Sequence, residues 1–319
     1  MRGEIRRIAT IVAVTMAAFF SSGCFKTRTV VRVNPDGSGE LTVEYLVSRA
    51  MIKQMETQMG QMMDQMRAMG AEVPERQPME QVLVSEKMLR HLAPMYGEVE
   101  FVSARALEQE GFVGSTAQYR FKDIRRIWIP LNDSQRGQML GTMMSQGKED
   151  ELPPIEAQKD EKTSLSFDWT PEADGGKLTV RMPELPMVEI EDDPNWEPPS
   201  ESDLTRQLAT QGGEAAQMFG LQPGMTHEEV LKRLLGEMEV RIDVQVAGTV
   251  KSTTAKYAVK DRPNTFTLFC MDFSRILNSP KGLRLFSDER FTNGPTPPLA
   301  KGVPGMEIEQ GEVSFEIAP

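Results

Sequence analysis

Apolar and polar residues alternate on both sides of a turn sequence, Asn34-Pro35-Asp36-Gly37-Ser38-Gly39. Alternation with a period of two places one set of side chains on one face of a strand, and Pro, Asp and Gly favour a chain reversal. The pattern predicts a β-hairpin near the N-terminus, and this hairpin constrains the fold more than any other feature. Its apolar positions are Val31, Val33, Leu41, Val43 and Tyr45.

The same turn places side-chain oxygen atoms at alternate positions, as at the start of a calcium-binding loop. These residues are Asn34, Asp36, Ser38 and Glu40. The distal bidentate Glu of an EF-hand loop is missing from the sequence, and the turn explains the same residues. We therefore interpret them as turn residues.

The next segments alternate between helical and strand patterns. Residues 48–70 and 76–95 have a helical period and predict two helices, which form a helical hairpin. Residues 98–107 and 112–121 predict two further strands. The order ββααββ predicts an α+β fold with antiparallel β-hairpins and a helical hairpin inserted between them.

The remaining sequence predicts a second, smaller α+β subdomain. Residues 132–146 predict a helix, and residues 165–169 and 178–182 predict another hairpin. A capping box at Thr226-His227-Glu228-Glu229 predicts a helix start, which assigns His227 to a first helical turn. Strands at 240–246, 255–259 and 266–270, followed by a helical turn to 277, complete this subdomain.

Composition changes along the chain predict its domain boundaries. Residues 1–23 form a signal peptide, and residues 24–188 form an N-terminal α+β domain. Residues 189–203 are acidic and rich in Pro, which is typical of a linker. Residues 204–279 form the C-terminal subdomain, and residues 280–319 form a tail rich in Gly and Pro.

Charge and motif content exclude several function classes. The net charge of −11 argues against a nucleic-acid partner, because Lys and Arg clusters normally bind phosphate backbones. His91 and His227 have no metal-ligand spacing around them, so no metal site of His and Cys is predicted. The sequence contains no nucleophile elbow, Walker loop or dinucleotide motif, and it favours a non-enzymatic role.

The first 24 residues predict export. Arg2, Arg6 and Arg7 precede the uncharged run 8–20, which is followed by Ser21-Ser22-Gly23-Cys24. This is the outline of a secretory signal, and the run is shorter than the roughly 20 residues of a membrane-spanning helix. Removal of residues 1–23 takes away three Arg and one Glu, so the net charge falls from −11 to −13.

Gly23 and Cys24 resemble the strictest positions of the bacterial lipoprotein lipobox, although Ser21 stands where that family usually has Leu. The resemblance implies that Cys24 becomes the N-terminus and carries acyl chains such as palmitate, which anchor the protein to the membrane. Phe25 after the cysteine implies sorting to the outer membrane, facing the periplasm. The ββαα order after the lipobox also resembles uncharacterised envelope lipoproteins, including the LppM-type domain, which implies no active site.

If Cys24 is acylated, Cys270 has no partner for an intramolecular disulfide. Cys270 alternates with Phe266 and Leu268 in an apparent strand, so we interpret it as a small buried residue rather than a nucleophile.

The helix predicted at 48–70 carries methionines where leucine is usual. At about 100° per residue these side chains fall on one face. The methionine face consists of Met51, Met55, Met59, Met62, Met63, Met66 and Met69.

Three interpretations of the methionine face remain open. Methionine fills irregular cores, it adapts to an apolar ligand, an acyl chain or a partner protein, and its thioether prefers Cu(I). No other cofactor is predicted. The sequence thus predicts a lipid-anchored cell-envelope protein with a binding or structural role, with a Cu(I)-binding protein and a carboxylate-dependent envelope hydrolase as alternatives.

Overall fold

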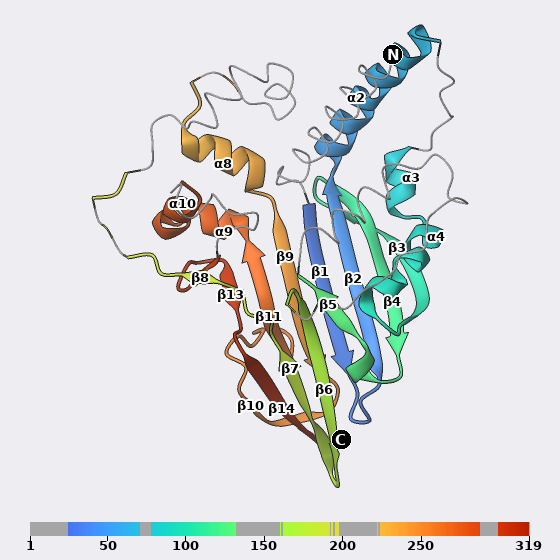
Figure 1. Ribbon diagram of the computed structural model, residues 1–319, viewed down its shortest axis with the longest axis vertical. Helices are drawn as coiled ribbons and strands as arrows, with labels where there is room; N and C mark the ends of the chain where they lie inside the picture. Colours follow the sequence, from blue (N-terminus) through green and yellow to red (C-terminus); the bar gives the residue numbers. More distant parts are fainter. Residues whose placement is uncertain are drawn as a thin grey trace. The chain divides into compact units, whose positions relative to one another are not determined.

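The computed structural model describes residues 25–70, 78–131, 160, 162–191, 193, 195–197, 222, 224–287 and 299–318. Helices and strands are mixed, so the predicted α+β class is confirmed (Figure 1). The elements divide into two compact units. The smaller unit contains Phe25 and the described parts of Pro186–Glu239 and Met271–Met306. The larger unit contains the described parts of Lys26–Leu185, Val240–Cys270 and Glu307–Pro319.

A seven-stranded sheet forms the main layer of the larger unit. The predicted hairpin is its centre, and the turn is closed by a hydrogen bond from the Asn34 amide to the Ser38 carbonyl (2.8 Å). Gly37 has φ +81, and a Cβ there would approach the Trp169 ring to 2.8 Å, so the turn requires glycine. The strand order is β13 (Met306–Ile308), β11 (Thr265–Asp272), β9 (Glu239–Val246), β1 (Phe25–Val33), β2 (Gly39–Ser48), β4 (Phe112–Phe121) and β3 (Glu100–Gln109).

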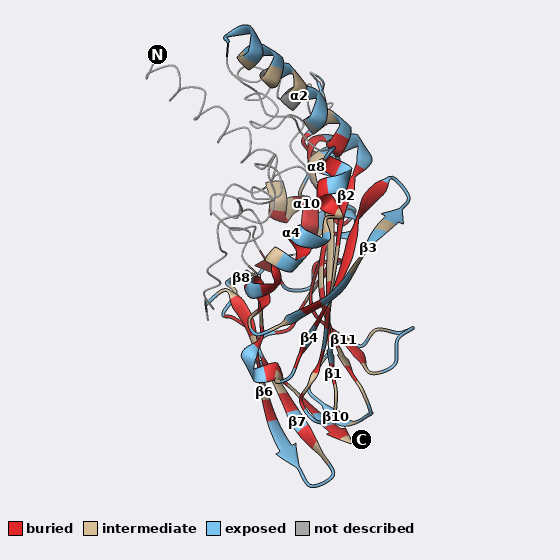
Figure 2. Cartoon of the chain, turned by 90° about the vertical axis from the view of Figure 1, so that its right-hand side faces the viewer, coloured by how far each residue is buried: buried red, intermediate tan, exposed pale blue. Residues whose placement is uncertain are grey.

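A five-stranded sheet forms the second layer of this unit. Its order is β10 (Thr249–Thr253), β14 (Glu312–Ala318), β7 (Gly175–Arg181), β6 (Ser164–Glu172) and β5 (Trp128–Pro130). Phe266 of β11 and Phe315 of β14 join the two sheets, with ring centroids 5.1 Å apart. The inward-facing residues of both sheets are buried and form the core, in red in Figure 2.

The helical segment after α2 (Arg49–Ala68) differs from the prediction. One helix was predicted at 76–95, whereas the chain forms α3 (Met79–Leu83), α4 (Glu86–His91) and a 3-10 turn, η1 (Ala93–Tyr96). Ser85 caps α4 by accepting a hydrogen bond from the Met88 amide, and Pro94 lies in the first turn of η1. These start signals divide the helix into short pieces. A second 3-10 turn, η2 (Ile124–Arg126), follows β4.

The described residues between 280 and 319 form helices and strands, which their composition did not predict. The predicted Gly- and Pro-rich tail contains α10 (Pro280–Ser287), β12 (Leu299–Ala300), β13 and β14. Val313, Phe315 and Ile317 of β14 alternate with polar residues and are at most 1% exposed. The strand period of β14 was present in the sequence, whereas the prediction of a tail followed Gly and Pro content alone.

The predicted strand at 255–259 was also wrong. These residues contribute one isolated bridge, between Ala258 and Phe266, and the neighbouring strand is β10 instead. The predicted helix at 132–146 lies outside the described residues. Whereas the predicted domains are consecutive segments, the units of the structure interleave along the chain, since β9, β11 and β14 complete the sheets of the larger unit.

The described residues of the smaller unit form three helices and one short parallel pair of strands. The helices are α8 (His227–Leu235), α9 (Phe273–Leu277) and α10, and the strands are β8 (Met187–Val188) and β12. The predicted capping box is confirmed: Thr226 accepts a hydrogen bond from the Glu229 amide, and Glu229 accepts one from the Thr226 amide. The helices enclose an apolar cluster of Leu231, Leu277 and Leu283, against which Trp196, Leu235 and Phe286 pack.

Candidate functional site

The helix α2 carries the predicted methionine face. It is a continuous helix of 20 residues, so its methionines have the predicted helical spacing. The side chains of Met55, Met59 and Met62 lie outside the described residues. Met51, Met63 and Met66 are half-buried.

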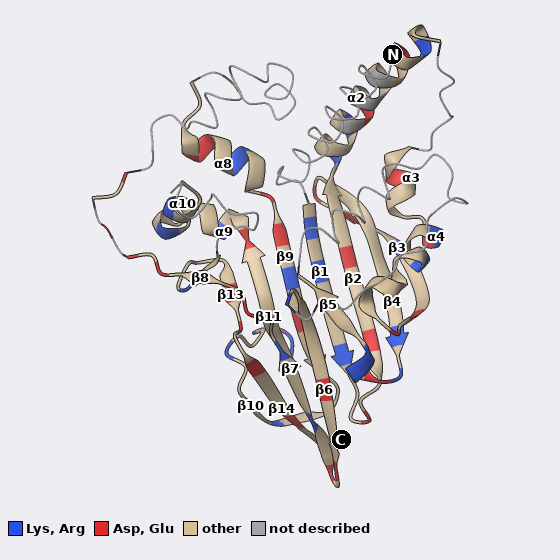
Figure 3. Cartoon of the chain, in the orientation of Figure 1, with Lys and Arg blue, Asp and Glu red and all other residues tan. Residues whose placement is uncertain are grey.

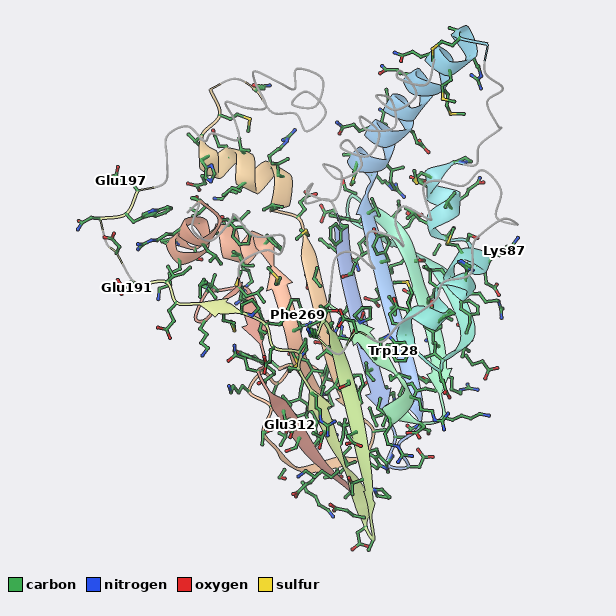
Figure 4. All side chains as sticks on the ribbon, viewed as in Figure 1. Lys87, Trp128, Glu191, Glu197, Phe269 and Glu312 are labelled. Atoms are coloured by element: carbon green, nitrogen blue, oxygen red, sulfur yellow. The ribbon has the colours of Figure 1, made fainter. Side chains whose placement is uncertain are left out.

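Exposure on this helix is greatest just after its last turn, where Met69 is 67% exposed, whereas Ile52 in the first turn is 3% exposed. The Glu56 carboxylate accepts a hydrogen bond from the Met79 amide of α3 (2.9 Å), so α3 lies beside the first half of α2. The C-terminal end of the helix is exposed (Figure 2), and methionine sulfur atoms lie at this end (Figure 4).

The start of α2 lies at the end of the sheet where β1 begins. β1 and β2 are joined by a tight turn and run antiparallel, so the end of β2 at Ser48 lies near Lys26 at the start of β1. The Arg49 amide donates a hydrogen bond to the Gly111 carbonyl (2.9 Å), and the Arg49 guanidinium bonds to Glu108 (2.8 Å). α2 is therefore tied to this end of the sheet and continues past it (Figure 1).

Basic side chains also gather at this end of the sheet. The Lys26 ammonium lies 4.2 Å from the centroid of the Phe112 ring, and Arg49 and Lys53 begin α2 (Figure 3). Lys26 lies two positions after the predicted anchor, Cys24, in the sequence. Cys24 itself lies outside the described residues.

Cys270 is a buried strand residue, as the sequence predicted. It is 3% exposed on β11 and takes part in no disulfide. Its position alternates with those of the apolar residues of the core, which agrees with a packing role.

A buried charge network, which the sequence analysis missed, joins three strands of the seven-stranded sheet. Asp243 of β9 is 0% exposed, and its carboxylate accepts hydrogen bonds from Arg28 Nη2 (2.6 Å), Arg241 Nε (2.9 Å) and Thr267 Oγ1 (3.0 Å). Burial acts to lower the pKa of Arg241, and the neighbouring Asp243 more than offsets this, so the pKa is raised. Two charged residues at 241 and 243 within an otherwise apolar strand were the sequence signal for this network. The sequence could not assign Arg28 to it, because Arg28 lies 215 positions from Asp243.

In the turn at Asn34–Ser38, the Asp36 carboxylate accepts hydrogen bonds from another residue of the same turn. Asp36 Oδ1 accepts hydrogen bonds from the amide (2.9 Å) and the hydroxyl (2.6 Å) of Ser38. These bonds lower the pKa of Asp36, since they favour the ionised carboxylate. This agrees with the interpretation of these residues as a turn.

In the described part of the chain, no group of three or more His, Cys, Asp or Glu side chains could hold a metal ion. Among the same residues, none of the helices combines the length and the apolarity that crossing a bilayer requires. Cu(I) binding by the thioethers of α2 and hydrolysis by a carboxylate pair stay predictions.

His227 occupies the first turn of α8, where the sequence placed it, but its environment is unusual. The imidazole is 8% exposed, and neither ring nitrogen has a hydrogen-bond partner. Burial lowers the pKa of His227, an effect that the nearby backbone of Phe286 partly opposes. His227 is therefore held in its neutral form within the smaller unit.

We expect the stability of the smaller unit to decrease at acidic pH. The unfolded chain binds a proton on His227 near the ordinary pKa of 6.5, and the folded unit binds it only at lower pH. The stabilisation is thus fully present above about pH 6.5 and is lost as the pH falls through the lowered pKa. Fluorescence of Trp196, which packs against the apolar cluster, measures urea midpoints between pH 5 and 8. The variant His227→Leu should flatten this dependence, and an equally steep curve in that variant would contradict the assignment.

Comparison with known proteins gives one structural similarity. No protein-family model matches this chain, and no curated protein matches it. The folded domain of LppM from Mycobacterium tuberculosis, solved by NMR, aligns with a TM-score of 0.28 and 10% identity, covering 94% of this chain and 93% of that one.

Proposed function

We propose that this chain is a lipid-anchored cell-envelope protein that acts by binding, through the methionine face of α2, rather than by catalysis. The observation that carries the proposal is the position of the lipobox-like cysteine. Cys24 directly precedes Phe25, which is the first residue of β1. Acyl chains on Cys24 would fasten the folded sheet itself to the membrane, with no intervening tether.

The energetics favour acyl chains as the anchor. Each buried CH₂ contributes about 0.8 kcal/mol, and one acyl chain alone binds only marginally, so two or three chains give stable attachment. The mature chain has a net charge of −13 and is repelled by anionic lipid. Electrostatic attraction therefore does not replace the chains. We place the protein on the periplasmic face of the outer membrane, on the basis of Phe25 after the cysteine.

The geometry of α2 supports a binding role. A helix packed wholly into its own core buries its apolar face along its full length. On α2 the described methionines Met51, Met63 and Met66 are only half-buried, and Met69 is 67% exposed. Flexible thioethers adapt to partners of varied shape, which suits an exposed contact face.

Substitution of the proposed acylated cysteine tests the anchor. We expect Cys24→Ser to move nearly all of the protein from the membrane fraction to the soluble fraction, because the thiol is the only acceptor for the chains. Mass spectrometry of the mature N-terminus should show acyl groups on Cys24 in the wild type and an unmodified, unprocessed N-terminus in the variant.

Cys270→Ser is the matched control, because it replaces the other cysteine and leaves the lipobox intact. This variant should stay in the membrane fraction with its N-terminal acyl groups. Recovery of the wild-type protein with an unmodified Cys24 thiol would overturn the proposed anchor.

A further inference from the structure

We propose that the methionine face of α2 lies in the interfacial layer of the same bilayer that holds the acyl chains of Cys24. This inference rests on the proposed lipid anchor and names the occupant of the methionine face. It assigns α2 as a second, non-covalent membrane contact.

The first step is the short distance between the anchor and the helix. Cys24 precedes β1 by one residue, and the start of β1 neighbours the end of β2, where α2 begins. Adjacent strands lie about 4.8 Å apart, and one residue spans about 3.5 Å. The first turn of α2 is thus within roughly 10 Å of an acylated Cys24.

The second step is steric. A helix of 20 residues is about 30 Å long, and α2 continues past the end of the sheet that the anchor holds at the membrane (Figure 1). The hydrogen bond from Arg49 to Gly111 and the bond from Met79 to Glu56 fix its first half. A helix that begins at the anchored edge and continues for about 30 Å is long enough to lie along the surface of the bilayer.

The third step is the chemistry of the two sides of α2. The exposed, polar side carries Lys53, Thr57 and Asp64, which are suited to water and headgroups. The opposite side carries the methionines, of which Met63 and Met66 are half-buried and Met69 is exposed. An interfacial helix requires this division into an apolar side and a polar side.

The basic residues at the start of the helix fit the same position. Lys26, Arg49 and Lys53 lie at the end of the sheet nearest to Cys24, and cations there are attracted to anionic headgroups. Two of the three interact with the protein itself, Lys26 with Phe112 and Arg49 with Glu108, so the apolar contact of the methionines is expected to dominate.

A vesicle-binding experiment without the acyl chains tests the helix alone. We would measure partitioning of the mature chain with Cys24→Ser onto vesicles of phosphatidylethanolamine and phosphatidylglycerol. The triple variant Met63→Gln, Met66→Gln, Met69→Gln keeps the helix propensity and removes the apolar side chains. We expect its partition coefficient to fall about 10- to 100-fold.

The matched control alters the opposite side of the same helix segment. The triple variant Thr57→Gln, Asp64→Gln, Ala68→Gln changes three exposed residues and should alter partitioning by less than about 3-fold. Circular dichroism of both variants checks that α2 is formed. Equal partitioning of the two triple variants would overturn the inference.

A second readout uses the native methionines as probes. In the wild-type, acylated protein reconstituted into vesicles, Met63, Met66 and Met69 should be oxidised by peroxide at least several-fold more slowly than in the vesicle-free Cys24→Ser chain. Equal rates with Cys24 acylated would overturn the membrane contact and leave the anchor intact. An unmodified Cys24 with vesicle-dependent protection would overturn the anchor alone. Protection without vesicles that increases with protein concentration would assign the face to a second copy and overturn the inference.

Discussion

Replacing Asp243 with alanine is expected to destabilise the larger unit by about 3–5 kcal/mol. The carboxylate is 0% exposed and accepts hydrogen bonds from Arg28, Arg241 and Thr267. Its removal leaves two guanidinium groups, with side chains 22% and 23% exposed, close together without their shared counter-charge. Their mutual repulsion and lost hydrogen bonds make this cost much larger than that of a surface ion pair.

Urea unfolding in a Trp196→Phe background measures this effect. Trp128 and Trp169 then report on the larger unit, since both lie within Lys26–Leu185. Glu98→Gln is the control, because it breaks the exposed ion pair with Arg126 (2.9 Å) and should cost less than about 1 kcal/mol. The prediction would be contradicted if Asp243→Ala lowered the free energy of unfolding by no more than Glu98→Gln does.

A rescue variant separates the charge effect from a loss of packing. Replacing Arg28 and Arg241 with methionine and Asp243 with leucine removes all three charges together. Because a buried ion network is often no more stabilising than well-packed apolar residues, this triple variant should recover most of the stability that Asp243→Ala loses.

Replacing Tyr119 with alanine is expected to cost a similar amount, about 3–5 kcal/mol. Tyr119 is 1% exposed, and its ring lies 5.6 Å from that of Tyr96 and 5.7 Å from that of Phe101, between centroids. Its hydroxyl donates a hydrogen bond to the Leu89 carbonyl (2.8 Å), which joins α4 to the sheet. Alanine leaves a cavity and removes this connection.

Tyr119→Phe is the informative control, because it keeps the ring and removes only the hydroxyl. We expect a loss of about 1 kcal/mol, together with faster hydrogen exchange of the α4 amides. Burial raises the pKa of Tyr119 above its ordinary 10.0, so its contribution is present below about pH 10 and is lost as the pH rises further. If Tyr119→Phe lowers the free energy of unfolding as much as Tyr119→Ala does, the stabilisation comes from the hydroxyl and not from the ring.

The candidate site was predictable only in part. The helical period identified α2 and the residues that share its methionine face. The burial of Ile52 and the exposure of Met69 were not predictable, because they depend on which distant elements pack against α2, such as α3 beside Glu56. The network around Asp243 was missed because its members belong to three strands that are distant in sequence.

Short-range features of the fold were determined by the sequence itself. The turn at Asn34–Ser38 and the capping box at Thr226 formed as predicted, because their hydrogen bonds join residues a few positions apart. β4 and β6 were found from their alternation for the same reason.

Only the tertiary structure decided which strands are neighbours. β9 lies beside β1, and β14 lies beside β7, although composition predicted that the segment containing β14 is a tail. Backbone hydrogen bonds are alike for every strand, so alternation identifies a strand without naming its partner. The choice is made by the burial of side chains from distant segments, such as Phe266 against Phe315 and Arg28 against Asp243, which no local pattern encodes.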